Sequence, residues 1–332
     1  MILVDAIYVN YGGALELLKY LVETFEVRNN QFYLLADARC KGMFDQLSNV
    51  EYQDASEKGR KLFYKCHEGE FSAVFCFGNV PPTYRLKVPV YTYFHNINML
   101  TLADCRDKKQ LVKFWLKRAF IKHYRKNTDE WFVQTSNTAT ELICHLGVPS
   151  DKVRLYPFYK LPKFPEVEGQ RTDYIFVGEY SGSKGHDELL EAWKILHEHG
   201  IDLTLHLTVS LGDAFLRKWQ ESVAQGVHII NHGFVSTDEL AKLYMQCKAT
   251  IYPSYNESFG LGLIEAMESG CDVIASDRPY VHAICQPSEV FDPALPNTIV
   301  DAVMRYEKEI RRQTVLTVCD KVDDMIDEIC KE

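Results

Sequence analysis

A chain of 332 residues is long enough for two domains of ordinary size, each with its own hydrophobic core. Its content of 46% hydrophobic and 25% charged residues is that of a globular protein rather than of a disordered chain. The net charge of −9 excludes a general attraction to nucleic acid, so any anionic partner has to be met by a local basic patch.

The cysteines and the N-terminus indicate a cellular setting. Ten cysteines occur without a Cys-x-x-Cys pair, which favours a reduced, cytoplasmic protein over a zinc knuckle. The first residues, MILVDAIYVNYGG, lack the basic start and apolar core of a signal peptide. No apolar run reaches the ~18 residues of a spanning helix. We therefore expect a cytoplasmic protein that does not cross a membrane, and contact with the inner membrane surface stays open.

Strands and helices alternate through the N-terminal part. Residues 2–9 predict a strand, the turn at Gly12-Gly13 follows it, and apolar residues at helical spacing follow the turn. This turn is not the full G-x-G-x-x-G pattern, so it either lets a ligand approach the backbone or only supplies a positive φ. Further alternation predicts a parallel sheet. Its other predicted strands are residues 32–36, 73–77 and 88–94.

His95 comes directly after the last of these strands, at the edge where open α/β sheets bind their ligands. Isolated histidines more often have a structural role, so the position alone leaves both roles open.

The most basic stretch of the chain is residues 105–126. Its apolar residues recur at three- and four-residue steps, which predicts an amphipathic helix. One interpretation is a helix on a membrane surface, and the other is a core-packed helix with a solvated basic face. The apolar residues are Leu111, Val112, Trp115, Leu116, Ala119 and Phe120, and the basic ones around them are Lys113, Lys117, Arg118, Lys122, Arg125 and Lys126.

Residues 129–169 close the first half. A strand is expected at residues 131–135, and Thr138 with Glu141 resembles a capping box that opens the next helix. The stretch from Leu161 to Gly169 contains prolines and a glycine and predicts a linker. We therefore place the domain boundary between residues 163 and 164.

The second half repeats the α/β alternation. A strand at residues 172–178 leads into a loop with Lys184, and strands at 203–210 and 227–232 lead to a turn with Phe234. Ser236 and Glu239 form a second capping-box pattern. Residues 298–332 are predicted to be helical.

The stretch around which the chain is organised is residues 250–277, which predicts a strand, a loop, a helix, a glycine stop and a second strand. The start of this helix attracts phosphate through its backbone N–H groups and its positive dipole end. Glu257 before it and Glu265 within it supply carboxylates for sugar hydroxyls, which suggests a nucleotide-sugar ligand. The residues at the helix start are Ser258, Phe259, Gly260 and Leu261.

The complete pattern is more specific. Pro253-Ser254, Glu257, seven intervening residues, Glu265-Ala266-Met267 and Gly270 resemble the E-x7-E region of retaining family-4 glycosyltransferases (group 1). The resemblance implies the GT-B fold, an α/β architecture of two Rossmann-like domains whose parallel sheets face a central cleft. It implies an acceptor-binding domain at residues 1–163 and a donor-binding domain at 164–332. Terminal helices in this fold often pack back on the first domain.

The resemblance also assigns roles to residues. Glu257 and His95 contact the transferred sugar, Glu265 contacts the ribose, and Lys184 with the amides of 258–261 holds the diphosphate. The implied catalytic residues are His95, Lys184 and Glu257. The implied donor-binding residues are Gly12, Gly13, Lys184, Phe234, Ser258, Phe259, Gly260, Leu261 and Glu265.

One position departs from the family pattern. Glu179 stands where the family usually has an arginine on the diphosphate. A carboxylate there would repel the diphosphate. Either Glu179 turns away, or another cation such as Arg278 or His282 compensates, or donor turnover is weak.

The resemblance implies a hexosyltransferase that retains the anomeric configuration. The expected donor is a nucleoside-diphosphate sugar, with a UDP-sugar first and a GDP-sugar second. The acceptor is a glycan or lipid-linked glycan, in surface polysaccharide assembly. No D-x-D motif occurs, so we expect neither a metal nor another cofactor. The alternatives are a non-catalytic nucleotide-sugar binder or partner subunit, and a GT-B sugar-nucleotide hydrolase or epimerase.

Overall fold

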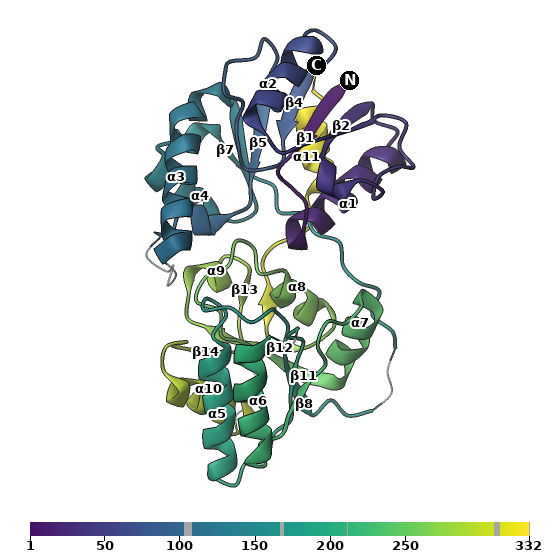
Figure 1. Ribbon diagram of the computed structural model, residues 1–332. Helices are drawn as coiled ribbons and strands as arrows, with labels where there is room; N and C mark the ends of the chain where they lie inside the picture. The colour runs from purple at the N-terminus through teal and green to yellow at the C-terminus, as the bar shows by residue number, and fades with distance from the viewer. Residues whose placement is uncertain (103–107, 167–168, 211, 309–312, 332) are drawn as a thin grey trace. The chain divides into compact units, whose positions relative to one another are not determined.

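The computed structural model describes residues 1–102, 108–166, 169–210, 212–308 and 313–331. The chain divides into two compact units, one of residues 1–160 with 319–332 and one of residues 161–318 (Figure 1). The division thus falls three residues before the boundary that we placed after residue 163. It also assigns the last fourteen residues to the first unit, whereas the sequence-based boundary left them in the second domain.

The first unit contains a seven-stranded parallel sheet in the order β3-β2-β1-β4-β5-β6-β7. Its strands are β1 (Ile2–Ala6), β2 (Phe32–Asp37), β3 (Val50–Gln53), β4 (Ala73–Cys76), β5 (Val90–Phe94), β6 (Glu130–Val133) and β7 (Val153–Leu155). Its helices are α1 (Gly12–Val27), α2 (Glu57–Cys66), α3 (Lys108–Tyr124), α4 (Ser136–Leu146) and α11 (Val322–Ile329).

The C-terminal helix α11 belongs to this unit because of its apolar face. Met325, Ile326 and Ile329 are buried in the same core as Leu18 and Leu21 of α1. Figure 1 shows α11, in yellow, beside the purple α1. Burying three such side chains contributes several kcal/mol, at about 1.5–3 kcal/mol each. That burial accounts for the return of the chain to the first unit.

The second unit contains a six-stranded parallel sheet in the order β10-β9-β8-β11-β12-β14. Its strands are β8 (Asp173–Phe176), β9 (Leu205–Leu207), β10 (Ile229–Asn231), β11 (Cys247–Tyr252), β12 (Asp272–Ser276) and β14 (Glu289–Phe291), with a small antiparallel pair of β13 (Cys285–Gln286) and β15 (Val315–Leu316). Its helices are α5 (His186–Glu198), α6 (Asp213–Ala224), α7 (Thr237–Gln246), α8 (Leu261–Glu268), α9 (Pro279–His282) and α10 (Pro296–Lys308).

Two helix starts test the capping-box predictions. The box at Ser236 and Glu239 is confirmed, since each side chain bonds the backbone of the other residue at the start of α7. The box at Thr138 is wrong, because α4 already begins at Ser136. Its cap is Thr135, whose hydroxyl accepts a hydrogen bond from the Thr138 N–H at 3.1 Å. Thr138 therefore lies inside the first turn, where it is fully buried.

The prediction of continuous helix over residues 298–332 is also wrong. Within the described residues of that range, α10 ends at Lys308, Val315 and Leu316 form strand β15, and α11 begins at Val322. Strand β15 pairs with β13, so a tertiary partner decides its conformation.

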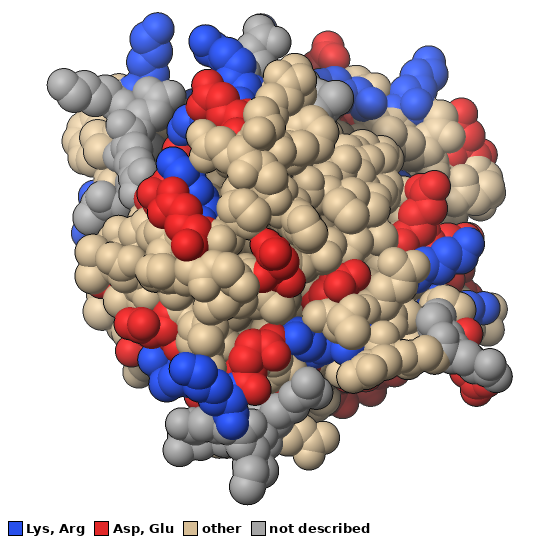
Figure 2. Space-filling model, turned by 90° about the horizontal axis from the view of Figure 1, so that it is seen from below, with Lys and Arg blue, Asp and Glu red and all other residues tan. Residues whose placement is uncertain are grey.

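Surface charge and helix length bear on the expected setting. On the face shown in Figure 2, acidic and basic side chains are interspersed, and neither sign forms a continuous patch. Among the described residues, no helix is both long and apolar enough to cross a membrane.

Candidate functional site

The sheet order places a ligand-binding position in the second unit. Strand β8 lies in the middle of the sheet, with β9 on one side and β11 on the other. The chain order reverses between β8 and β11. In open parallel sheets, ligands bind at such a reversal, beyond the carboxyl ends of the strands. The two loops that leave these ends contain Lys184, before α5, and Glu257, before α8.

The two loops are packed against each other. The Tyr255 N–H donates to the Ser183 carbonyl at 2.8 Å. Gly185 has a φ of +68°, and a Cβ built there would lie 2.3 Å from the Pro253 carbonyl oxygen. Any other residue at 185 would thus strain its backbone and separate the loops. The glycine is required because it lets the Lys184 segment lie directly on the loop after β11.

This packing brings Lys184 and Glu257 together. The Lys184 Nζ donates to Glu257 Oε1 at 2.5 Å, and the hydroxyl of Tyr252 lies 3.4 Å from the same oxygen. The two charged side chains remain 24% and 14% exposed. Among the described residues, Lys184 forms no ion pair other than this one. An anion that reaches Lys184 therefore competes with a single carboxylate.

Helix α8 begins directly beyond this pair. Gly260 is its N-cap with a φ of +78°, so the turn into the helix favours glycine. Ser258 and Phe259 precede the cap, and Leu261 opens the helix. The first N–H groups of a helix have no acceptor within it, and this end also carries the positive dipole. The predicted arrangement of a cation next to a helix N-terminus is thus present.

Glu265 lies one turn into α8 and has a buried partner that the sequence did not predict. The hydroxyl of Tyr244, from α7, donates to Glu265 Oε2 at 3.3 Å and lies 3.3 Å from the Gly262 carbonyl. Burial raises the pKa of Glu265 to about 7. Burial therefore disfavours the ionised form of this carboxylate, and hydrogen-bond donors from a ligand would stabilise that form. Tyr244 was missed because it is 21 residues away in the sequence.

Glu179 turns to the neighbouring loop. Its carboxylate accepts hydrogen bonds from the N–H of Ser210 at 3.0 Å and from its hydroxyl at 2.5 Å, so it joins the loops after β8 and β9. Of the two candidate substitute cations, Arg278 lies 3.5 Å from Asp292, and His282 lies 2.7 Å from Asp277. The geometry favours the first of the three alternatives for Glu179.

Phe234 lies on the turn after β10 and is 85% exposed. Asn231 supports the end of this strand: its side chain accepts from the Val209 N–H at 3.0 Å and donates to the Val209 carbonyl at 2.9 Å. The end of β10 is thereby fixed to the end of β9. An exposed aromatic ring on such a rim suits stacking on a planar ligand.

The other predicted residues lie in the first unit. His95 follows β5. The Nε2 of its ring lies 2.9 Å from the Phe77 carbonyl oxygen, and its backbone N–H donates to Asn79 Oδ1 at 2.7 Å. Burial lowers the pKa of His95 to about 4, so the ring is neutral at pH 7. Gly12 and Gly13 begin α1, and a positive φ of 65° is found at Gly12. The structure thus supports the turn role at Gly12 and leaves the ligand role a prediction.

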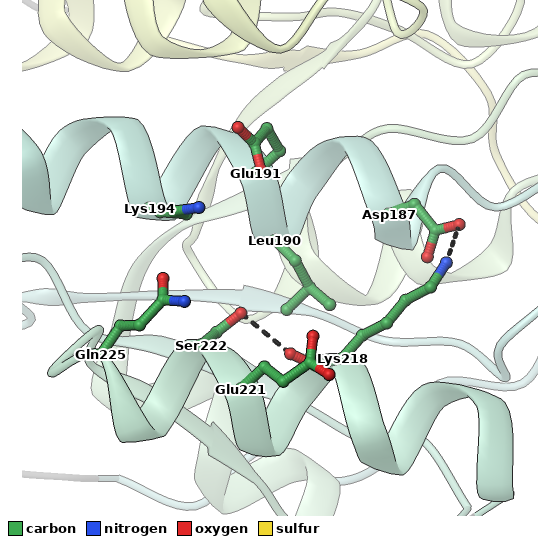
Figure 3. A pocket seen from close by; sticks show the side chains of 8 residues that line it. All are labelled: Asp187, Leu190, Glu191, Lys194, Lys218, Glu221, Ser222 and Gln225. Atoms are coloured by element: carbon green, nitrogen blue, oxygen red, sulfur yellow. Dashed lines mark hydrogen bonds and ion pairs between the residues drawn. The ribbon is translucent and has the colours of Figure 1, made fainter.

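A surface hollow of about 260 Å³ occurs between α5 and α6 (Figure 3). It is lined by Asp187, Leu190, Glu191, Lys194, Lys218, Glu221, Ser222 and Gln225. None of the predicted site residues is among them. Lys218 donates to Asp187 at 2.6 Å, so one of the two lysines that line the hollow is already paired. We place the site at the loops after β8 and β11. Within the described residues, no group of three His, Cys, Asp or Glu side chains could hold a metal ion.

Comparison with known proteins defines the class. The sucrose-phosphate synthase of Thermosynechococcus elongatus has a TM-score of 0.70 at 15% identity, over 93% of this chain and 90% of that one. WaaG, a glycosyltransferase involved in lipopolysaccharide biosynthesis, has a TM-score of 0.66 at 12% identity, over 100% of both chains. With two parallel α/β sheets, these likenesses confirm the expected fold class, GT-B.

The sequence then gives the family of the second unit. Residues 160–316 match the model for glycosyl transferases group 1 and form a domain of that family. The O-antigen chain mannosyltransferase RfbU of Salmonella typhimurium is 48% identical over 89 residues, 24% of this chain and 25% of that protein. The serotype-specific mannosyltransferase WbdA of Escherichia coli is 31% identical over 137 residues, 40% of this chain. The chain spans only 17% of the length of WbdA.

Proposed function

We propose that this protein is a retaining hexosyltransferase that moves a sugar from a nucleoside-diphosphate sugar to a glycan or lipid-linked glycan. The observation that carries the proposal is the pairing of Lys184 with Glu257 beside the N-terminus of α8. The group 1 domain covers these residues, and its named relatives include an O-antigen mannosyltransferase. We further propose a role in surface polysaccharide assembly.

The leaving diphosphate carries the largest developing charge of such a transfer. Lys184 and the amides at the start of α8 would stabilise that charge, because fixed donors stabilise a developing anion without reorganising. The incoming diphosphate would take Lys184 from Glu257. The freed carboxylate then accepts hydrogen bonds from the sugar hydroxyls. The resting ion pair thus keeps both groups in position before the donor binds.

Glu265 would bind the ribose and Phe234 would contact the base. His95 is neutral, so it would orient the sugar through hydrogen bonds rather than through charge. We propose that the reaction needs no metal, since Lys184 and the helix dipole supply the positive charge at the diphosphate. A UDP-sugar is the first donor to test and a GDP-sugar the second. Mannose is included among the sugars because of the RfbU and WbdA matches.

The test is a thermal-shift titration with UDP, GDP, ADP, TDP and CMP, each with and without EDTA. A ligand at a hundred times its dissociation constant adds ~2.7 kcal/mol of stability. That stability corresponds to a shift of ~5–10 °C for domains of this size. We expect one nucleoside diphosphate to give this shift, and EDTA to leave it unchanged.

Release of the diphosphate from the matching sugar nucleotide then tests transfer. A transferase releases it faster when a lipid-linked or free glycan acceptor is added. Equal release without an acceptor would identify a hydrolase or epimerase instead. Binding without release under any acceptor would identify a non-catalytic binder. A shift that disappears with EDTA would contradict metal independence.

A further inference from the structure

The loop after β4 contains a residue with an unusual backbone conformation. Asn79 has a φ of +67°, and among the described residues Asn29 is the only other non-glycine residue with a positive φ. Such a conformation persists only where the surroundings fix it, and it is often found at functional sites. Asn79 is 6% exposed, and Arg60 donates to the carbonyls of the next two residues, Val80 and Pro81, at 2.8 and 3.0 Å. The loop is therefore fixed, and the side chain of Asn79 has a defined position.

That side chain faces His95, which follows the neighbouring strand β5. The Oδ1 of Asn79 accepts from the backbone N–H of His95 at 2.7 Å, and its Nδ2 lies 3.3 Å from Nε2 of the ring. The rings of Phe77 and Tyr93 lie beside the imidazole, with centroids 5.3 and 6.1 Å away. Asn79 thus contacts both the backbone and one edge of the ring of His95.

The contacts of the ring define its tautomer. Nε2 lies 2.9 Å from the Phe77 carbonyl oxygen, which can only accept, so Nε2 carries the proton. In the other tautomer, the lone pair of Nε2 would face that oxygen at 2.9 Å, and its donor would be the more distant Nδ2 of Asn79. Burial lowers the pKa of His95 to about 4, and the carbonyls of Phe77 and of His95 itself offset only part of this. A neutral ring has one N–H, so Nδ1 carries a lone pair.

Nδ1 is available to a ligand. Among the described residues it makes no hydrogen bond to another residue, and His95 is partly exposed. No charged side chain of the described part of the chain contributes to the lowered pKa, and the titratable neighbour Tyr93 donates its hydroxyl to the Tyr156 carbonyl at 2.8 Å. His95 therefore presents a hydrogen-bond acceptor at the carboxyl edge of the sheet, where α/β sheets bind their ligands.

We propose that Asn79 is a positioning residue which, together with the Phe77 carbonyl, holds His95 as the Nε2–H tautomer, so that Nδ1 accepts a hydrogen bond from a hydroxyl of the transferred sugar. The proposal rests on the proposed function, in which His95 contacts that sugar. It also makes the contact specific, because only a group that donates can pair with Nδ1. A sugar with a hydrogen or a fluorine in place of that hydroxyl leaves Nδ1 unpaired.

Nitrogen NMR tests the tautomer without any turnover. In the full chain with ¹⁵N-labelled histidine, two-bond correlations to the ring protons distinguish protonated from unprotonated nitrogens. The chain has 11 histidines, and the signals of His95 are those that disappear in His95→Gln. At pH 7 we expect a protonated Nε2 and an unprotonated Nδ1. UDP-glucose or GDP-mannose should shift the Nδ1 resonance, whereas UDP and GDP alone should leave it in place.

Two substitutions of His95 compare its nitrogens in transfer kinetics. The Oδ1 of asparagine is bonded to Cγ as Nδ1 is, so it supplies an acceptor in nearly the same place. The side chain of glutamine instead ends where Nε2 was. We expect the kcat of His95→Asn to exceed that of His95→Gln at least about tenfold, as one hydrogen bond made in the transition state would give.

Asn79→Gly removes the amide and keeps the positive φ without strain. We expect its kcat to fall at least about tenfold, with unchanged affinity for the nucleoside diphosphate. Asn29→Gly is the matched control, since it makes the same change at an exposed residue of the same unit with a φ of +56°, and its kcat should not change. Asn79→Asp keeps the acceptor and brings a negative charge near Nε2. It should restore kcat at pH 8 and move the acid limb of the pH profile to higher pH, because a nearby carboxylate raises the pKa of His95.

Three results would overturn the proposal. One is a protonated Nδ1 in the neutral ring, and another is a His95→Gln enzyme at least as active as His95→Asn. The third is an Asn79→Gly enzyme as active as Asn29→Gly. Thermal unfolding of each variant verifies that it is folded. If the wild type transfers no sugar to any acceptor, the proposed function fails, and the NMR measurement still decides whether Asn79 and Phe77 fix the tautomer.

Discussion

Each of the two sheets carries a cation and a carboxylate near the carboxyl end of its central strands, but the two pairs differ in what surrounds them. In the first unit, Arg60 of α2 donates its Nε–H to Asp5 of β1 at 2.6 Å, and both side chains are almost completely buried. In the second unit, Lys184 meets Glu257 with both side chains partly exposed. The difference separates a structural pair from a pair that a ligand can open.

The buried pair has no remaining capacity for a ligand. Arg60 also donates to Glu57, to the carbonyls of Val80 and Pro81 and to the Cys76 sulfur, at 2.8 to 3.3 Å. These bonds and the one to Asp5 equal the five N–H donors of a guanidinium. Arg60 therefore holds α2 and the loop after β4 against β1. Lys184 has a more flexible side chain and a single carboxylate partner, so exchange of that partner costs little.

The largest expected effect is on the buried pair. Asp5→Ala leaves the Arg60 charge without its buried partner, and breaking such a pair typically costs about 3–5 kcal/mol. We expect a fall in Tm of ~6–20 °C at ~2–4 °C per kcal/mol. Differential scanning calorimetry measures it.

The control for Asp5→Ala is Glu16→Ala, which breaks the exposed pair with Lys19 on α1. Exposed pairs contribute less than about 1 kcal/mol, so its Tm should hardly change. A loss below about 1 kcal/mol in Asp5→Ala would remove the contrast between the two pairs.

The second expected effect is on turnover. Lys184→Ala removes the cation that we assign to the diphosphate, and losing one such donor typically lowers kcat by about a hundredfold. Stability should change by about 1 kcal/mol or less, because the pair is partly solvated. Steady-state transfer kinetics and thermal unfolding of the same variant measure both quantities.

Lys218→Ala is the matched control, since it also breaks a lysine–carboxylate pair of the second unit, with Asp187 at 2.6 Å. Its kcat should equal that of the wild type. If Lys184→Ala loses stability as Asp5→Ala does and keeps its kcat, the Lys184 pair is structural and its proposed role fails.

Local sequence patterns predicted most of the fold. The alternation of apolar runs with turn residues placed β2, β4, β5 and β6 within about two residues of their observed ends. The pattern around Glu257 and Glu265 predicted a loop and helix that the structure places at the reversal of the sheet order. These features depend on neighbours in the sequence, so they can be seen in it.

The features that were missed depend on distant partners. Arg60 and Tyr244 reach carboxylates 55 and 21 residues away, and no local pattern marks such contacts. The direction of Glu179 was open until Ser210 was placed beside it.

The two interpretations of residues 105–126, of which 105–107 lie outside the described residues, could not be separated by spacing. Ile121 and Phe114 of α3 pack on the core, whereas Val112, Trp115 and Leu116 are more than half exposed. Periodicity identifies faces and not what covers them.

The smallest expected effect concerns Glu265, whose burial sharpens the contrast with the solvated pair next to it. Its pKa is about 7 when folded and 4.5 ordinarily, so the folded state binds more protons between these values. Stability from this group is complete below pH 4.5 and is lost as pH rises through 7. At pH 8 the loss is about 2 kcal/mol, discounted for partial exposure. Glu265→Gln should avoid that loss and melt ~4–8 °C higher relative to wild type at pH 8 than at pH 4.5.

The exposed Glu268 on the same helix supplies the control, since Glu268→Gln should keep the wild-type pH dependence. Ribose hydroxyls donate better to an ionised carboxylate than to a protonated one. The nucleotide affinity of the wild type should therefore rise more steeply between pH 6 and 8 than that of Glu265→Gln, whose remaining pH dependence comes from the terminal phosphate of the nucleotide, with a second pKa of about 6. Isothermal titration of the responding nucleotide measures this. A parallel rise in both proteins would show that the titrating group lies elsewhere, and Glu265 would then be a buried partner of Tyr244 and not the ribose ligand.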